Sequence, residues 1–321
     1  MSNHRTTPPS RRLLMRTAAV GVAAPALGAG AATAASAAPA GKRAKAGAAS
    51  YRWLGTTGWR VDFAGRTVLF DPYVTRFDTG VFSGRFDPAT ALRTDEALVA
   101  RHTGSPELIM VSHSHWDHVN DVPFIARSTG AKVIGTETTY HLLRAMGVPA
   151  AQLIVVRGGE VLDFDGYVVE AVSSRHSRNK AHAYLLPGTL TAPPAETPRT
   201  IGDLPEGDTL AFQLTVGDGP SVFMMGASDF SARELTGLRP DAALVPPPGS
   251  SSTYRYTARL MAALDHPGTV VPVHWDNFEL PLADGPVRDE GVDLDRFARD
   301  VRAASPYSRV IVPDYRTTYR F

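Results

Sequence analysis

The sequence HSHWDH at His113–His118 constrains this chain more than any other feature. It places four potential metal ligands within six residues, directly after the apolar run Leu108–Val111. An apolar run of this kind predicts a buried strand, so the histidines lie where the strand ends and the backbone can curl. Imidazole and carboxylate groups bind zinc and related divalent ions. Histidine accounts for only 10 of 321 residues, which argues against a chance cluster, and we interpret the segment as a metal site.

The first 37 residues have the pattern of an export signal. A paired arginine in Ser10–Arg16 precedes the weakly apolar stretch Thr17–Ala34, and Ala35–Ala37 offers a cleavage site of small residues. This pattern resembles a bacterial twin-arginine signal peptide, so we expect a secreted or extracytoplasmic protein that engages the twin-arginine export machinery. A retained membrane anchor is the alternative. Residues 38–50, rich in Ala, Gly and Lys, are expected to form a disordered linker.

Composition excludes several classes of function. The chain has no cysteine, which rules out disulfides, thiolate metal ligands and a cysteine nucleophile. Without the four arginines of residues 1–37, 29 basic residues stand against 32 acidic ones, a net charge of −3. Nucleic-acid binding needs a basic face, and the sequence shows no basic block, so we expect no nucleic-acid partner. Residues 51–321 suit one α/β domain.

The hydrophobic pattern predicts strands and helices in two successive blocks, which favours a layered sandwich with the helices outside. Strands are expected at Tyr51–Leu54, Trp59–Phe63, Thr67–Phe70, Leu108–Val111, Lys132–Ile134, Leu153–Val156, Val161–Phe164, Tyr167–Val172, His182–Leu186, Leu210–Val216, Val222–Met225, Ala242–Val245, Val270–Val273 and Val310–Val312. Helices are expected at Asp95–His102, Asp121–Ser128, Glu137–Met146, Thr253–Leu264 and Leu294–Ala303.

Three further residues of metal-ligand type follow predicted strands. They are His176, Asp229 and His274. A lone His or Asp at a strand end is commonly a turn former or a cap. The recurrence of such residues at strand ends, after a strong primary cluster, instead indicates one rim of a sheet where all of them meet.

The whole pattern resembles the metallo-β-lactamase superfamily. Members carry an Asp after an early strand, a His-x-His-x-Asp-His loop, a later His, a bridging Asp and a final His. Here Asp71, the 113–118 loop, His176, Asp229 and His274 match these positions. The resemblance implies an αββα sandwich of the α/β class.

One branch of the superfamily is the most similar. The opening WLGTTGW at Trp53–Trp59 resembles the ascorbate-phosphate lactonases, and the closing pair His274-Trp275 is also similar to the N-acyl-phosphatidylethanolamine phospholipases D. The chain departs from this branch at Thr56, where a histidine is usual, and at Asp276-Asn277, which replace Gly-Thr. Ser228 also replaces a common glycine before the bridging Asp. Because of these departures, the resemblance does not determine the identity of the substrate.

The resemblance implies a role for each ligand. One metal ion would be held by His113, His115 and His176, and a second by Asp117, His118 and His274, with Asp229 bridging the two. We expect zinc, while manganese and iron also accept such ligands. Two such ions can lower the pKa of a shared water toward ~7 and so provide a metal-bound hydroxide at neutral pH.

Two carboxylates have further expected roles. Asp117 would also steer the attacking water and shuttle its proton, which makes it the catalytic candidate. Asp71 would support the ligand loop by orienting it from behind the ligands. The alternative for Asp71 is a turn carboxylate before Pro72.

Candidate substrate contacts follow His176 and flank the ligands. Arg178, Lys180 and His182 lie on a loop that could face the metals, where basic groups suit a phosphate or carboxylate. A solvated loop is the alternative. Trp116 and Trp275 each adjoin a ligand and could form an apolar wall, although ordinary core packing is the alternative for both.

These observations predict an exported dinuclear metal hydrolase that cleaves an ester, lactone or phosphodiester bond in a small molecule or lipid. A β-lactam hydrolase is one alternative. Cysteine-dependent zinc β-lactamases are excluded, and those with a histidine-rich second site usually lack the bridging Asp, so Asp229 argues against them. A non-catalytic metal-binding module on the same fold is the other alternative. The natural substrate, the native metal and the oligomeric state stay open.

Overall fold

The computed structural model describes residues 48–179, 181–248 and 252–321. Within them the strands form two sheets, with the orders β14-β1-β2-β3-β4-β5-β6 and β13-β12-β11-β10-β9-β8-β7. The first sheet contains β1 (Ser50–Gly55), β2 (Gly58–Phe63), β3 (Arg66–Phe70), β4 (Leu108–Met110), β5 (Lys132–Gly135), β6 (Leu153–Val155) and β14 (Thr318–Tyr319). The second contains β7 (Val161–Phe164), β8 (Tyr167–Ser173), β9 (Leu210–Val216), β10 (Ser221–Met225), β11 (Ala242–Val245), β12 (Thr269–Pro272) and β13 (Arg309–Val310).

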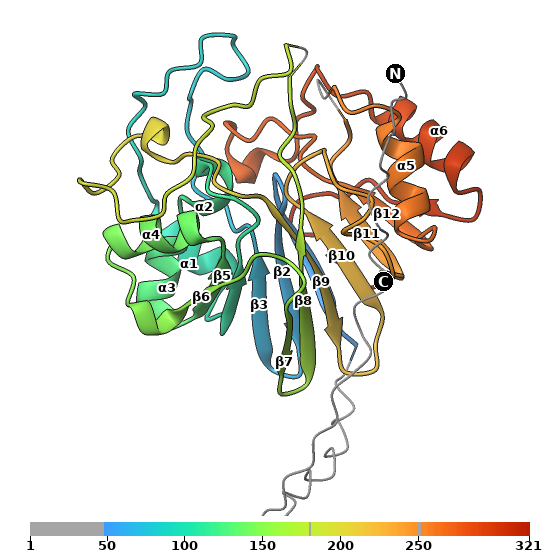
Figure 1. The fold of residues 1–321 in the computed structure, drawn as a ribbon, viewed down its shortest axis with the longest axis horizontal. Coiled ribbons are helices and arrows are strands. Elements are labelled where there is room, and N and C mark those ends of the chain that lie inside the picture. The colour runs from blue at the N-terminus through green and yellow to red at the C-terminus, as the bar shows by residue number, and fades with distance from the viewer. Residues whose placement is uncertain (1–47, 180, 249–251) are drawn as a thin grey trace, which may run out of the picture. The chain divides into compact units, whose positions relative to one another are not determined.

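Helices cover the outer faces of both sheets. Figure 1 shows α1, α3 and α4 on one side and α5 and α6 on the other, with the two sheets between them. The α-helices are α1 (Glu96–Thr103), α2 (Trp116–Val119), α3 (Val122–Thr129), α4 (Glu137–Ala145), α5 (Tyr256–Ala263) and α6 (Leu294–Ala304). The expected αββα sandwich is therefore confirmed.

Strand direction explains why the sheets can carry a site along one edge. β1, β2 and β3 pair antiparallel, whereas β3, β4, β5 and β6 pair parallel. In the second sheet β10, β11, β12 and β13 are also parallel. Parallel neighbours place their carboxyl ends at the same edge of a sheet. The loops after β3 and β4 therefore emerge together, as do those after β10 and β12.

Burial explains the sequence pattern of the strands. All three residues of β4 and all four of β11 are buried, as expected for strands covered on both faces. The core between the sheets joins residues of both, for example through Phe70 and Phe212, whose rings lie 6.2 Å apart. A second core fills the space between the second sheet and helices α5 and α6, with Leu260 and Phe297 fully buried.

Side-chain caps fix the ends of the outer helices. Asp95 accepts a hydrogen bond of 2.9 Å from the backbone N–H of Leu98 at the start of α1. Asp293 does the same for Arg296 at the start of α6, at 2.8 Å. An N-cap carboxylate of this kind satisfies one of the unpaired N–H groups of a helix and contributes about 1 kcal/mol.

The expected strand at His182–Leu186 is wrong, because this segment is an irregular loop. Both terminal residues have a left-handed backbone, with φ of 58° and 39°, which a strand does not allow. The Asn179 side chain accepts hydrogen bonds from the N–H groups of Ala181 and Ala183, at 2.9 and 3.0 Å. This asparagine turn overrides the local preference for a strand.

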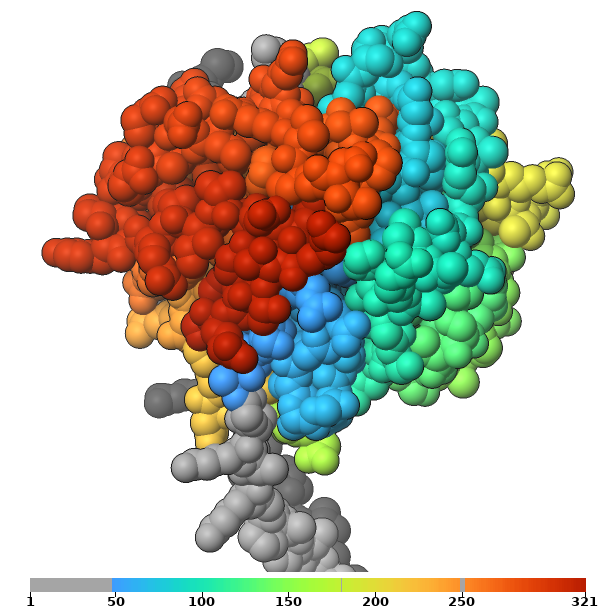
Figure 2. All heavy atoms as spheres, turned by 180° about the vertical axis from the view of Figure 1, so that it is seen from behind, coloured from blue at the N-terminus to red at the C-terminus, as the bar shows by residue number. Residues whose placement is uncertain are grey.

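The remaining differences concern the ends of predicted elements and elements that were not predicted. The helix expected from Thr253 begins at Tyr256, and the last predicted strand shortens to Arg309–Val310. The strand β14 was not predicted; it pairs with β1, with Tyr319 opposite Tyr51. Figure 2 shows these C-terminal residues (red) beside the first strands (blue).

The leader expected at residues 1–37 lies outside the described residues, as does the linker up to residue 47. The first strand already begins at Ser50. Among the helices that the structure describes, none is both apolar enough and long enough to span a membrane.

Candidate metal centre

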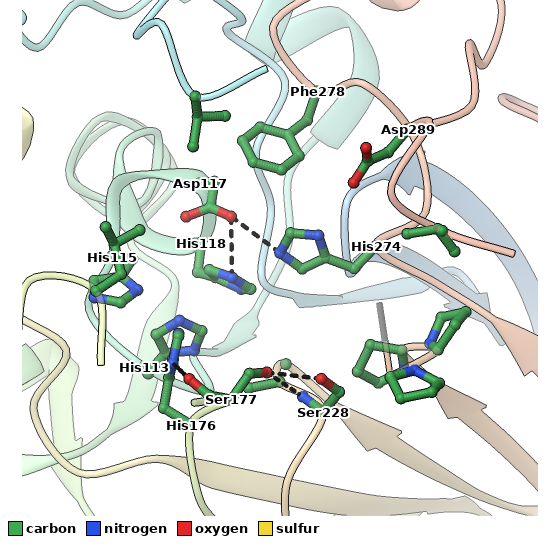
Figure 3. A pocket seen from close by; sticks show the side chains of 18 of the residues that line it. His113, His115, Asp117, His118, His176, Ser177, Ser228, His274, Phe278 and Asp289 are labelled. Carbon is green, nitrogen blue, oxygen red and sulfur yellow. Dashed lines mark hydrogen bonds and ion pairs between the residues drawn. The ribbon is translucent and has the colours of Figure 1, made fainter. Parts of the chain in front are cut away.

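The first candidate metal group consists of His113, His115 and His176. His113 and His115 lie on the loop after β4, and His176 follows β8 of the other sheet. Their candidate ligand nitrogens all lie within 4.8 Å of one another. Figure 3 shows the three rings facing one another at the floor of a pocket. The two sheets therefore meet in this group, as expected from the strand ends.

The second candidate group consists of Asp117, His118 and His274. The short helix α2 presents Asp117 and His118, while His274 follows β12. The Nε2 atoms of His118 and His274 lie 3.3 and 3.2 Å from Oδ2 of Asp117. Both pairs are drawn in Figure 3. The two groups are adjacent, since the rings of His113 and His118 are 3.9 Å apart.

Asp71 supports the ligand loop from behind the ligands. Its Oδ1 accepts the N–H of Ser112 at 2.7 Å, and its Oδ2 accepts the hydroxyls of Ser112 and Thr57 at 2.6 and 2.9 Å. The same Oδ2 lies 2.9 Å from Nδ1 of His118. This contact leaves Nε2 of His118 for a metal ion, the arrangement by which carboxylates usually orient ligating histidines. The completely buried Asp71 thus lies where the sequence placed it.

The first group has the electrostatics of a cation site. Burial lowers the pKa of His115 to about 3 and that of His176 to about 4, and it holds the pKa of His113 well below its usual value. Nε2 of His113 and of His115 is buried without a hydrogen-bond partner. A buried, neutral imidazole nitrogen with no partner is costly unless a ligand such as a metal ion fills the gap.

The second group attracts positive charge. Burial alone would lower the pKa of His118, but the carboxylates of Asp117 and Asp71 outweigh it and raise this pKa to about 10. Burial alone would raise the pKa of Asp117, but His118 and His274 hold it well below its usual value. The two carboxylates therefore favour a positive charge at this position, which a bound metal ion would supply. Both groups fit a metal ion.

A pocket of about 230 Å³ opens above the two groups. Its apolar wall includes Trp116 and Phe278, whose rings lie 6.4 Å apart, together with Leu185. Its polar wall includes Ser177 and Ser228, whose hydroxyls hydrogen-bond at 2.8 Å. Figure 3 shows Phe278 beside His274 and the two serines on the opposite side. The space suits a small molecule or one end of a longer one.

Asp229 does not join either metal group in the structure. Its Oδ1 accepts the N–H of Phe230 at 2.8 Å, and its Oδ2 lies 3.7 Å from Nη2 of Arg178. The residues of this turn that line the pocket are Gly226, Ala227 and Ser228. The structure therefore places Asp229 outside both groups of candidate ligands, and its bridging role stays a prediction.

The path of the turn after β10 explains this difference. A Cβ at Gly226 would lie 1.9 Å from Oγ of Ser112, so the turn packs directly against the support of the ligand loop. Asp229 then forms a backbone bridge with Arg175, and it is not among the described residues that line the pocket. Residues 227 and 228 reach the cavity in its place.

The predicted substrate contacts lie mostly away from the pocket. Arg178 pairs with Asp229, and His182 is exposed on its loop. Lys180 lies outside the described residues. Neither Arg178 nor His182 lines the pocket, so the alternative of a loop without substrate contact describes these two residues better.

The two tryptophans next to ligands differ. Trp116 lines the pocket, while Trp275 is 5% exposed and packs at a tilt against Trp53, with ring centroids 5.3 Å apart. Core packing therefore describes Trp275. The aromatic wall beside the second group is Phe278, whose ring lies 5.1 Å from that of His274.

Sequence reasoning also missed Thr57. Its hydroxyl lies 3.0 Å from Nδ1 of His118 and contacts Asp71 as well. Its place in the turn at residues 55–58 gave no signal, since a threonine in a turn is ordinary. Phe278 lies close behind the His274 ligand in sequence, which was the one available indication of its role.

Comparison with known proteins shows the superfamily to which this chain belongs. The model of the Beta-lactamase superfamily domain matches residues 50–274, so the chain belongs to this superfamily. A UPF0173 metal-dependent hydrolase from Pyrobaculum arsenaticum is 26% identical over 230 residues, covering 71% of this chain and 85% of the relative. A UPF0173 metal-dependent hydrolase from Methylobacterium nodulans is 28% identical over 240 residues, covering 72% and 88%.

Solved structures agree on the fold. Igni18, a metallo hydrolase from Ignicoccus hospitalis, superposes with a TM-score of 0.53 at 20% identity, covering 86% of this chain and 100% of that chain. Together with the relatives, the match makes this protein a metal-dependent hydrolase with the metallo-β-lactamase fold. Membership of the lactonase-like branch stays a prediction.

Proposed function

We propose that this protein is an exported hydrolase with two divalent metal ions, zinc being the expected metal, and that it cleaves an ester, lactone or phosphodiester bond in a small molecule or lipid. The observation that supports the proposal most is the pair of adjacent three-ligand groups opening into one pocket. The leader at residues 1–37 supports export.

His113, His115 and His176 would hold one ion, and Asp117, His118 and His274 the other. When bound, the two ions would supply Lewis acidity, which activates water at neutral pH and polarises the substrate oxygen. Asp117 faces the pocket (Figure 3) and is the carboxylate placed to orient the attacking water and accept its proton. Phe278 and Trp116 would bind the apolar part of the substrate and keep water from it.

The charge of the candidate ligands restricts the classes of substrate that the site would favour. With Asp229 outside both groups, the six candidate ligands include one carboxylate, Asp117, and five imidazoles. Two divalent ions would leave this centre positive before a hydroxide binds, even counting Asp71 beside His118 and Asp289 on the pocket wall. A positive, partly enclosed site attracts a substrate that carries negative charge near the bond to be cleaved. Phosphodiesters and carboxylate-bearing esters or lactones fit this requirement better than neutral esters.

The experiment is a screen of the zinc-loaded full-length protein against lactones, bis(p-nitrophenyl) phosphate and phospholipids, with metal content measured in parallel. We expect two equivalents of metal and turnover of at least one anionic substrate, and His115→Ala should abolish that turnover while leaving the fold intact. Two bound equivalents without hydrolysis of any substrate would instead favour the non-catalytic metal-binding module.

A β-lactam hydrolase is the second candidate. The argument against it rested on Asp229 as a bridging ligand, and the structure places that carboxylate outside both metal groups. β-Lactams also carry the negative charge that the centre favours. Nitrocefin turnover faster than that of bis(p-nitrophenyl) phosphate and the lactones would make this candidate the better one.

A further inference from the structure

A buried cluster of Arg76, Asp276 and Tyr315 lies beside the second metal group. Nη2 of Arg76 is 3.3 Å from Oδ2 of Asp276, and Nη1 of Arg76 donates to the Tyr315 hydroxyl at 2.7 Å. That hydroxyl in turn donates to Asp276. The side chains of Arg76 and Asp276 are 2% and 0% exposed. Both charges are therefore paired inside the protein and withdrawn from water, although Nε of Arg76 has no hydrogen-bond partner among the described residues.

The cluster ties the turn between β1 and β2 to the segment that carries His274. Both carboxylate oxygens of Asp276 accept the N–H of Thr56, at 3.0 and 3.2 Å. The carbonyl of Thr56 accepts the N–H of His274 at 2.7 Å. The next residue, Thr57, contacts His118 through its hydroxyl. A single turn thus touches both histidines of the second group.

The turn needs such a restraint because its backbone is strained. Thr56 has a φ of 50° and His274 a φ of 57°, and a left-handed backbone is unfavourable for a β-branched residue such as Thr. Conformations of this kind persist only where neighbouring groups hold them. A Cβ at Gly55 would lie 1.7 Å from Nη2 of Arg76, so glycine is what allows the guanidinium to reach Asp276.

Fold stability alone is a weak reason for this arrangement. A buried ion pair often contributes no more than apolar residues of the same volume would, because both charges lose their hydration. The pair does, however, fix the relative positions of its partners. Asp276 accepts its full set of hydrogen bonds only when Thr56, Arg76 and Tyr315 are all in place. Thr56 and Asp276, both departures from the lactonase-like branch, are thus direct partners.

We propose that the Arg76–Asp276–Tyr315 cluster positions His274 and the Thr57 partner of His118 for the second metal ion. None of the three residues belongs to a candidate ligand group or lines the described part of the pocket, so they would act through the backbone of the turn. The first group serves as an internal reference, since its direct contacts run to Ser112, Leu186 and Ser177 and it meets the turn only indirectly, through Asp71. This proposal rests on the two-ion site of the proposed function.

The test is a zinc titration of metal-free protein against a competing chelator, with the two binding steps resolved. Asp276→Asn keeps the size of the side chain but removes its charge, and Tyr315→Phe removes only the hydroxyl. We expect the affinity of the second site to fall roughly tenfold or more in Asp276→Asn and severalfold in Tyr315→Phe, as for other residues that support metal ligands. The first site should stay within about twofold in both.

Glu107→Gln provides the control. It breaks the Arg66–Glu107 ion pair, whose oxygen and nitrogen lie 2.6 Å apart, at the end of β4 opposite the ligand loop. It should change neither metal affinity. Tyr315→Phe retains the aromatic ring and keeps the test decisive even if Asp276→Asn does not fold.

Two results would overturn the proposal: equal weakening of both sites in parallel with the melting temperature, or unchanged affinity of the second site in Tyr315→Phe. If the wild-type protein binds only one zinc ion, the proposed function itself is contradicted. This outcome is distinct from the two results that would overturn the role of the cluster.

Discussion

Replacing Asp229 with asparagine tests whether this carboxylate is a bridging metal ligand or lies outside the metal site. As a bridging ligand, Asp229 would be needed for the second ion. In the structure its Oδ1 accepts the N–H of Phe230, a bond that an asparagine oxygen retains, and its Oδ2 lies 3.7 Å from Nη2 of Arg178. The Arg178 side chain is 38% exposed and that of Asp229 is 6% exposed, and a partly exposed pair at this distance contributes about 1 kcal/mol. We therefore expect Asp229→Asn to lower the melting temperature by about 2–4 °C at most.

The same variant should retain two equivalents of zinc, with both affinities within about twofold of the wild type, since no ligand is lost. Metal content and a chelator titration measure this, and Asp117→Asn is the matched control because it changes a carboxylate that does lie in a metal group. The control should lose the second equivalent. Loss of one equivalent from Asp229→Asn as well would refute the placement of Asp229 outside the site.

Three other predictions concern pH, metal removal and export. Burial raises the pKa of Glu206 to about 7, above its unfolded value, so the folded state binds more protons and stability is lost as pH rises from 4.5 through 7. Glu206→Gln should therefore raise the melting temperature at pH 8 by about 2–4 °C, corresponding to about 1 kcal/mol after discounting for partial exposure, and by less at pH 5. A chelator should lower the melting temperature of the zinc-loaded wild type, because zinc binds the folded state, and an unchanged melting temperature would contradict the metal site. Replacing Arg11 and Arg12 with lysine should retain the protein inside the cell, which fractionation and immunoblotting would show, and unchanged export would contradict the twin-arginine leader.

The local part of the site was predictable from the sequence. The ligand loop follows an apolar run, and the short helix after it needs only sequence neighbours to place Asp117 and His118. His176 and His274 were also predictable as members of the two candidate groups, because both follow strands whose ends lie at the same edge. Strand ends come from hydrophobic periodicity, which sequence reveals directly.

The sequence could not show that Asp229 lies outside the two candidate groups, because hydrophobic periodicity does not determine which residue of a turn faces the pocket. Whether residue 227, 228 or 229 faces the pocket depends on the turn after β10, and this turn is fixed by the close approach of Gly226 to Ser112, more than a hundred residues earlier in the chain. An offset of one or two residues in a turn leaves the hydrophobic pattern unchanged. The sequence therefore contains the ligand type without showing whether it reaches the ions.

The Arg76–Asp276–Tyr315 cluster illustrates the same limit more strongly. Arg76 and Asp276 are 200 positions apart in the chain, and a charged residue on its own usually predicts an exposed surface. The left-handed residues Thr56 and His274 lie where this cluster holds the backbone. Local propensities place the strands that lead to this rim, whereas long-range polar contacts set the direction of each side chain beyond it. The chemistry of the site depends on those directions, which explains why its ligands could be named from sequence more reliably than its geometry.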